Sequence, residues 1–178
     1  MSGRERVYWT LGFFALVAAI VGAISFARMM GIEGAPDNPL VGQAAPAWSL
    51  PAVGEAEDVS LEDMAGQVVL VDFWASWCGP CRHSIPALNQ VHDRYEGQIR
   101  MYGINLDHGL DDAGIRRAHQ SFGARFPSLH DAQGAVQAAY GVQSIPTVVL
   151  IDREGVVRFV QRGVPDPDLV GDAIDELL

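Results

Sequence analysis

Residues Val71–Cys81 read VDFWASWCGPC, and this stretch decides the fold of the 178-residue chain. It begins inside an almost continuous apolar run, Val68–Trp74, of the kind found in strands that are buried on both faces of a sheet. Two cysteines follow in the motif CGPC (78–81), where Pro80 suits the first turn of a helix because its missing N–H is not needed there. The stretch therefore predicts a buried strand, a turn and a helix that opens on a pair of thiols.

Cys78 and Cys81 are the two cysteines of the chain. A disulfide that closes so small a loop restricts the unfolded chain little, and a zinc site would need about four ligands, so redox cycling suits the pair better. At a helix N-terminus, free N–H groups and the helix dipole stabilise a thiolate on Cys78. We therefore expect Cys78 to attack, Cys81 to resolve one turn deeper, and the two to form a disulfide, with no cofactor and no metal.

Asp72 stands in the middle of the apolar strand, where an ionisable side chain is expensive to bury. A resolving thiol needs a proton acceptor because burial raises its pKa. Asp72 is therefore the candidate base for Cys81. The alternative is that Asp72 lies at an exposed end of the strand or accepts a backbone hydrogen bond.

Pro146 directly precedes an apolar run, Thr147–Ile151, and proline is tolerated in a sheet mainly where it starts a strand. X-Pro bonds adopt the cis form far more readily than other peptide bonds. A cis-Pro146 that faced the cysteines would leave the backbone of Ile145 open to an extended peptide substrate.

The hydrophobic pattern outside these motifs predicts one α/β domain with the element order β-α-β-α-β-α-β-β-α after an N-terminal hairpin. The hairpin is expected from Trp48–Ala52 and Asp58–Leu61, and a capped helical turn from the residues that follow it. The later elements are a strand at Ile99–Leu106, a helix at Asp111–Phe122, a strand at Ser128–His130, a helix at Gln133–Tyr140, a hairpin from Thr147–Ile151 and Val156–Val160, and a helix at Asp168–Leu178.

The formal net charge of −10 argues against a nucleic-acid partner, which would need a basic face. The N-terminus carries a separate signal. Residues Val7–Phe26 contain no charged side chain, and about 20 helical residues span the hydrocarbon layer of a membrane. Arg4 and Arg6 precede this run, as the positive-inside rule expects for a cytoplasmic N-terminus.

This pattern predicts a cytoplasmic N-terminus at 1–6, a single transmembrane anchor at 7–27, a linker at 28–45 and the catalytic domain at 46–178 on the extracytoplasmic side of the inner membrane. Ser25-Phe26-Ala27 also has the small-x-small form of a signal-peptidase site. A cleaved signal peptide is therefore the alternative to an anchor.

The segment Val71–Cys81 resembles the active-site segment of thioredoxins almost letter for letter, and the surrounding plan resembles the membrane-tethered TlpA/ResA/CcmG(DsbE)-like branch. The resemblance covers roughly residues 38–178. Other segments that resemble the branch are Asn38–Gln43, Ala45-Pro46, Leu61–Gly66, Phe126-Pro127, His130-Asp131, Tyr140–Thr147 and Ile151–Gly155.

The resemblance implies a thioredoxin fold with an N-terminal hairpin extension and a central insert. It also implies a cis-Pro146, a buried base at Asp72 and a substrate contact at Trp77, beside Ile145 and Pro146. Two positions depart from the pattern. Ser84 stands where the branch often has an acidic residue, and Gly103 stands where thioredoxin has a lysine beside its buried aspartate.

Three function classes follow. The first is a thiol–disulfide oxidoreductase, most simply a periplasmic protein-disulfide reductase that receives electrons from a thiol-relay partner in the membrane. In this branch, substrates are commonly apocytochrome c or metal-centre assembly proteins. The second is a copper-binding assembly factor that uses the two thiolates. The third is a peroxidase of the peroxiredoxin type, which would normally carry Thr where Ala75 stands.

Overall fold

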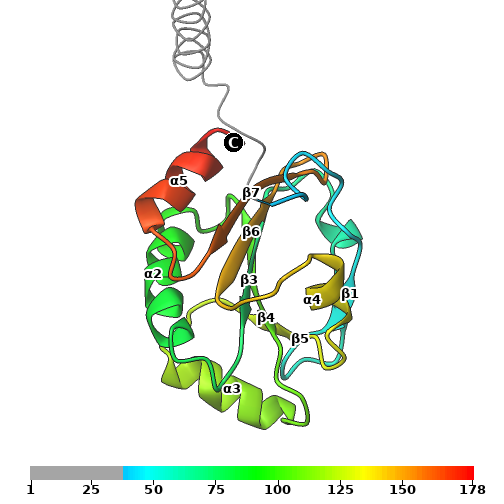
Figure 1. Cartoon of the computed structure of the whole chain (residues 1–178), viewed down its shortest axis with the longest axis vertical. Helices are drawn as coiled ribbons and strands as arrows, with labels where there is room; N and C mark the ends of the chain where they lie inside the picture. Colours follow the sequence, from blue (N-terminus) through cyan, green and yellow to red (C-terminus); the bar gives the residue numbers. More distant parts are fainter. Residues whose placement is uncertain (1–37) are drawn as a thin grey trace, which may run out of the picture. The chain divides into compact units, whose positions relative to one another are not determined.

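A five-stranded mixed sheet forms the centre of the domain, with the strand order β5-β4-β3-β6-β7 (Figure 1). The computed structural model describes residues 38–178. Strand β3 pairs in parallel with β4, and β4 in parallel with β5, whereas β6 is antiparallel to both β3 and β7. The strands are β3 (Val69–Trp74), β4 (Arg100–Asn105), β5 (Ser128–His130), β6 (Thr147–Ile151) and β7 (Val157–Arg162).

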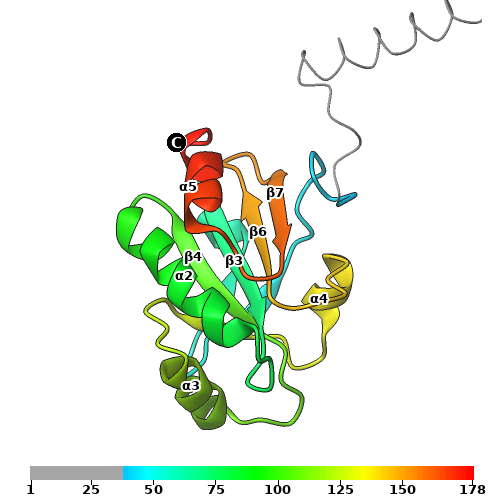
Figure 2. The ribbon, with the colours of Figure 1, turned by 60° about the vertical axis from the view of Figure 1, so that its left-hand side comes forward.

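Two layers cover this sheet. Helices α2 and α5 lie together on one face, and α4 lies with β1 on the other (Figures 1 and 2). The α3 residue Ile115 belongs to the same apolar core as α2 and α5. The helices are α2 (Cys81–Arg94), α3 (Asp112–Ser121), α4 (Ala135–Ala139) and α5 (Pro167–Asp175). The element order expected from the sequence is confirmed, and it gives the thioredoxin fold.

The continuous apolar run of β3 is buried on both faces of the sheet. All six of its residues are buried. Leu70 and Trp74 pack under α2 and α5, whereas Val71 and Phe73 pack on the opposite face. Because side chains alternate along a strand, Asp72 shares the face of Leu70 and Trp74 and lies beneath α2.

The N-terminal hairpin is confirmed. β1 (Ser49–Pro51) pairs antiparallel with β2 (Asp58–Ser60), and the turn η1 (Glu62–Met64) follows. Residues 38–45, expected in the linker, also contact the domain. The N–H of Gly42 donates to the carbonyl of Val157 at 2.7 Å, and the N–H of Ala45 to that of Gly155 at 2.8 Å. The described domain therefore extends to Asn38.

The predicted anchor at 7–27 lies outside the described residues, as do the N-terminus 1–6 and most of the predicted linker. Within residues 38–178, no helix combines the length and the apolar character needed to cross a membrane.

Candidate active site

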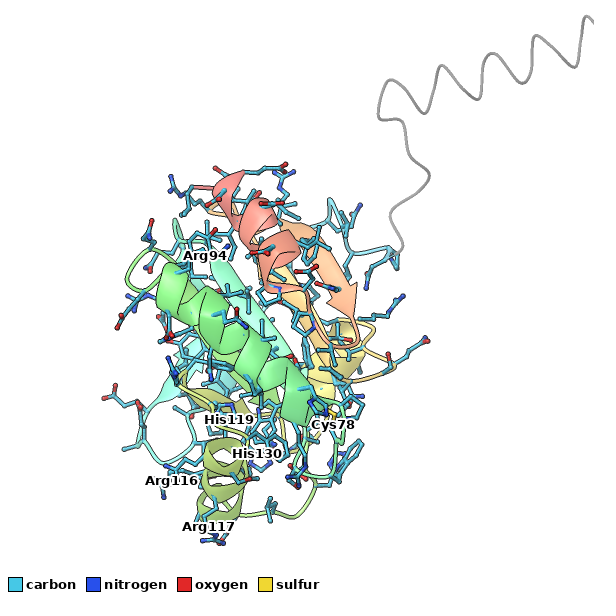
Figure 3. All side chains as sticks on the ribbon, turned by 90° about the vertical axis from the view of Figure 1, so that its left-hand side faces the viewer. Cys78, Arg94, Arg116, Arg117, His119 and His130 are labelled. Carbon is cyan, nitrogen blue, oxygen red and sulfur yellow. A yellow bond between two sulfur atoms is a disulfide. The ribbon has the colours of Figure 1, made fainter. Side chains whose placement is uncertain are left out.

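The two cysteines form a disulfide at the point where the chain passes from β3 to α2. Their Cα atoms are 5.3 Å apart. Helix α2 begins at Cys81. Cys78 therefore precedes the helix, whereas the sequence had predicted that Cys78 opens it. Cys78 lies in a turn closed by a hydrogen bond from its N–H to the carbonyl of Ala75 at 3.1 Å. Figure 3 shows Cys78 at this end of α2.

Hydrogen bonding and burial differ between the two sulfurs. The Sγ of Cys78 accepts a hydrogen bond from the N–H of Cys81 at 3.1 Å, so a backbone donor at the start of α2 points at the first sulfur. Cys81 is fully buried, and Cys78 is 3% exposed. The donor can stabilise negative charge on Cys78, whereas Cys81 is shielded by the core.

Asp72 is completely buried under α2, on the face of the sheet that also receives Cys81. Neither carboxylate oxygen has a hydrogen-bond partner among the described residues. Burial raises the pKa of Asp72 well above its usual value of 3.8. The alternative of an exposed strand end or a backbone partner is therefore wrong, and the carboxyl group is suited to accept a proton inside the core.

Gly103 lies directly opposite Asp72 on β4, which confirms that it neighbours the buried acid from the next strand. A Cβ atom at Gly103 would stand 2.8 Å from the indole Nε1 of Trp74 and 3.3 Å from Nε2 of His119. A lysine there would displace both rings. Ser84, the second departure, is buried on α2, and its hydroxyl has no hydrogen-bond partner among the described residues.

His119 is a buried ring beside this site that the sequence analysis missed. It stacks on Trp74 with ring centroids 4.5 Å apart, and its Nε2 has no hydrogen-bond partner in the described part of the chain. Burial lowers the pKa of His119 to about 4. Its position one turn after the buried Ile115 places it on the inner face of α3, and that spacing was the available signal.

The Ile145–Pro146 bond is cis, as the resemblance implied. Thr147 pairs with Phe73 near the carboxyl end of β3, so Pro146 lies at the edge of the sheet that also carries the turn to Cys78. Ile145 is half-buried against the core that contains both cysteines. Trp77 is 70% exposed beside Cys78. The structure thus brings the predicted substrate contacts and the disulfide to one edge.

Within residues 38–178, no group of three His, Cys, Asp or Glu side chains is placed to hold a metal ion. The arrangement that is present consists of a dithiol–disulfide pair, a buried acid behind it and an exposed aromatic side chain in front of it.

Comparisons with known proteins agree with this chemistry. The model of the AhpC/TSA family matches residues 41–160. The chain is 33% identical over 123 residues to the thioredoxin-like protein YneN of Bacillus subtilis, covering 68% of this chain and 71% of that protein. It is 29% identical over 164 residues to the thiol-disulfide oxidoreductase ResA of Geobacillus thermodenitrificans, covering 92% and 91%.

Solved structures give the same result. A Chlorobium tepidum protein described as a thiol:disulfide interchange protein of the DsbE type superposes with a TM-score of 0.69 at 34% identity, covering 80% of this chain and 99% of that one. The exposed lipoprotein thioredoxin Etrx1 of Streptococcus pneumoniae superposes with a TM-score of 0.65 at 25% identity, covering 74% and 100%.

Proposed function

Because the chain belongs to the AhpC/TSA family and is a protein-disulfide oxidoreductase, we propose that it reduces disulfides in proteins outside the cytoplasm. The observation that carries this proposal is the fully buried Asp72, which has no hydrogen-bond partner within residues 38–178 and lies on the sheet face that packs against Cys81. A carboxylate without partners accepts a proton readily, and a buried resolving thiol needs such an acceptor.

The proposed reaction has two exchange steps. In the reduced enzyme, the thiolate of Cys78 attacks one sulfur of the substrate disulfide, that bond breaks, and the other substrate sulfur leaves as a thiolate. Cys81 then passes its proton to Asp72 and attacks the Cys78 sulfur of the mixed disulfide. The second substrate thiolate leaves, and the Cys78–Cys81 disulfide of the structure remains.

Trp77, Ile145 and Pro146 are proposed to contact the substrate. Their common position at the sheet edge and the 70% exposure of Trp77 support this role. An extended peptide laid along the Ile145 backbone would bring its disulfide to Cys78, the more accessible of the two sulfurs.

The Gly-Pro pair between the cysteines is the one found in thioredoxin, whose potential is about −270 mV, and it supports reduction over oxidation. A reductase in an oxidising compartment must receive electrons, so we propose a membrane thiol-relay donor. Apocytochrome c and metal-centre assembly proteins are the proposed substrates on the strength of the family resemblance. A potential near about −120 mV would instead indicate an oxidant.

The test uses two single variants. Cys78→Ser is expected to abolish insulin reduction because the attacking sulfur is lost. Cys81→Ser is expected to accumulate mixed disulfides with cellular proteins, seen as adducts on non-reducing gels that disappear with dithiothreitol. The double variant is the control and should form no adducts. If Cys81→Ser forms none either, the assignment of the two cysteines is wrong.

A further inference from the structure

Asp107 is a buried acid at the same edge of the sheet, and both of its carboxylate oxygens contact Ser76 in the redox turn. It follows the end of β4 and is 5% exposed. One carboxylate oxygen, Oδ2, accepts a hydrogen bond from the N–H of Ser76 at 2.8 Å. The other, Oδ1, accepts a hydrogen bond from the Ser76 hydroxyl at 2.7 Å. Asp107 therefore holds both the backbone and the side chain of Ser76.

Asp107 is itself fixed by the neighbouring strands. The side-chain amide of Asn105, a fully buried residue of β4, donates to Oδ2 at 2.8 Å, and the N–H of Asp107 donates back to the amide oxygen at 3.1 Å. Nε2 of His130, at the end of β5, lies 2.9 Å from the carbonyl oxygen of Asp107 and donates to it. Figure 3 shows His130 and Cys78 at the same end of the domain.

Ser76 links Asp107 to the redox turn, because it lies two residues before Cys78 and next to the exposed Trp77. Trp77 has too little buried surface to hold the turn by packing. Besides the disulfide, the turn is held by the bond from the Cys78 N–H to Ala75, by the bond from the Cys81 N–H to the Cys78 sulfur and by the two bonds to Asp107. The disulfide is absent from the reduced enzyme, which leaves the hydrogen bonds around the turn to limit the movement of Cys78.

We propose that Asp107 is a positioning residue for the dithiol. When the Cys78–Cys81 disulfide is reduced, Asp107 acts through Ser76 to keep the turn before Cys78 in the geometry that allows the disulfide to form. This inference rests on the proposed function of Cys78 and Cys81. Asp107 touches neither substrate nor sulfur; it acts by lowering the conformational freedom that Cys78 would lose on closing the bond to Cys81.

The Asp107→Asn variant separates the effect of the hydrogen bonds of residue 107 from the effect of its negative charge. Its oxygen can accept from the Ser76 N–H and from Asn105, and its amide nitrogen can donate to the Ser76 hydroxyl, which also accepts hydrogen bonds. Asp107→Asn therefore keeps all three contacts without the charge, whereas Asp107→Ala loses all three.

The experiment equilibrates the full-length protein with glutathione redox buffers and measures the equilibrium constant for forming the Cys78–Cys81 disulfide. Asp107→Ala is expected to lower this constant about tenfold, equal to about 30 mV, while Asp107→Asn stays within about twofold of the wild type. If Asp107→Ala changes nothing, or if Asp107→Asn falls as far, positioning by Asp107 is disproved.

Asp152→Ala is the matched control. Asp152 is 4% exposed and accepts hydrogen bonds from two backbone N–H groups and from Arg158, but it follows β6 at the opposite edge of the sheet. The Asp152→Ala variant should lower the free energy of unfolding without changing the equilibrium constant for forming the Cys78–Cys81 disulfide. An equal shift in this control would show that general destabilisation is the cause and would overturn the proposal.

Ser76→Ala decides the question if circular dichroism shows that Asp107→Ala does not fold. It removes the hydroxyl contact and leaves the backbone contact, so a smaller shift in the same direction is expected, and no shift contradicts the proposal. The glutathione equilibrium does not depend on protein substrates. A wild type that fails to reduce insulin would therefore count against the proposed function alone.

Discussion

Asp72 shows how one buried side chain links stability to catalysis. Its carboxyl group lies in the core without a hydrogen-bond partner in the described domain, and an unpaired buried acid is unfavourable when charged. The native protein therefore holds a proton on Asp72 over a pH range in which the unfolded chain has lost it. The same desolvation makes the carboxylate a better proton acceptor for Cys81.

The sign of the pH dependence follows from this raised pKa. The contribution of Asp72 to stability is complete below the unfolded pKa of 3.8 and is lost as the pH rises through the native pKa. Asp72→Asn is therefore expected to increase the free energy of unfolding at neutral pH, on the order of 1 kcal/mol or more, because a neutral amide replaces the charge. The gain should vanish at pH 3.

Urea unfolding of the two proteins at pH 7 and pH 3 measures this difference. The same variant should slow the resolution step near neutral pH because the proton acceptor for Cys81 is lost. A variant that resolves mixed disulfides with an unchanged pH–rate profile would remove Asp72 from the mechanism, even if its stability increased as expected.

At the scale of elements, the pairing of β3 with β4 determines which rings lie beside the buried acid. Because Gly103 has no side chain, the indole of Trp74 reaches across β4 and donates to the Ser128 hydroxyl of β5 at 3.1 Å. Helix α3 then places His119 on that indole. The space that a lysine at 103 would need, opposite Asp72, is therefore occupied by the rings of Trp74 and His119.

His119 should make the packing of α3 sensitive to acid. Burial lowers its pKa from 6.5 to about 4, so the stability that it contributes is present above pH 6.5 and is lost as the pH falls toward 4. Between pH 7 and pH 5, a variant without this imidazole is expected to lose about 2 kcal/mol less unfolding free energy than the wild type loses.

His119→Phe keeps a stacking ring but cannot be protonated, and urea unfolding at pH 7 and pH 5 measures the change. Because both proteins retain Asp72, its opposite pH dependence cancels in the comparison. His83→Phe, at an exposed position of α2, is the control and should follow the wild type. Equal acid sensitivity of His119→Phe and wild type would contradict the buried neutral state of His119.

At the scale of the described domain, the chain enters at one edge of the sheet and carries its chemistry at the other. Gly42 and Ala45 bond to the beginning of β7 and the turn before it, and this edge also contains Val69 at the start of β3. Cys78 follows the opposite end of β3. The dithiol therefore lies at the opposite end of the domain from residues 42–45.

The proposed anchor at 7–27 is tested with alkaline phosphatase fused after Leu178. The fusion is expected to be active, because the enzyme folds outside the cytoplasm, and to sediment with membranes. Deletion of residues 1–27 is the control and should give an inactive fusion. An inactive full-length fusion reverses the proposed topology, and an active one that is released supports a cleaved signal peptide.

Local patterns in the sequence were sufficient for the order of elements, the buried strand before the cysteines, the place of Asp72 within it and the proline that begins β6. Apolar runs, helical spacing and turn residues act between neighbours in the chain, so they are visible without a structure. The resemblance to thioredoxin, and no local pattern, placed Gly103 beside Asp72.

The tertiary structure alone decided that Asp72 has no hydrogen-bond partner in the described domain, that His119 lies on Trp74, and that Asp107 bonds to Ser76 across 31 positions of sequence. Asp107 meets Ser76 because parallel strands bring their carboxyl ends to one edge of the sheet. His119 reaches Trp74 because α3 packs on the sheet, and residues 38–45 add to β7 at the opposite edge. Such contacts depend on register and packing between distant segments, and no local pattern of residues encodes them.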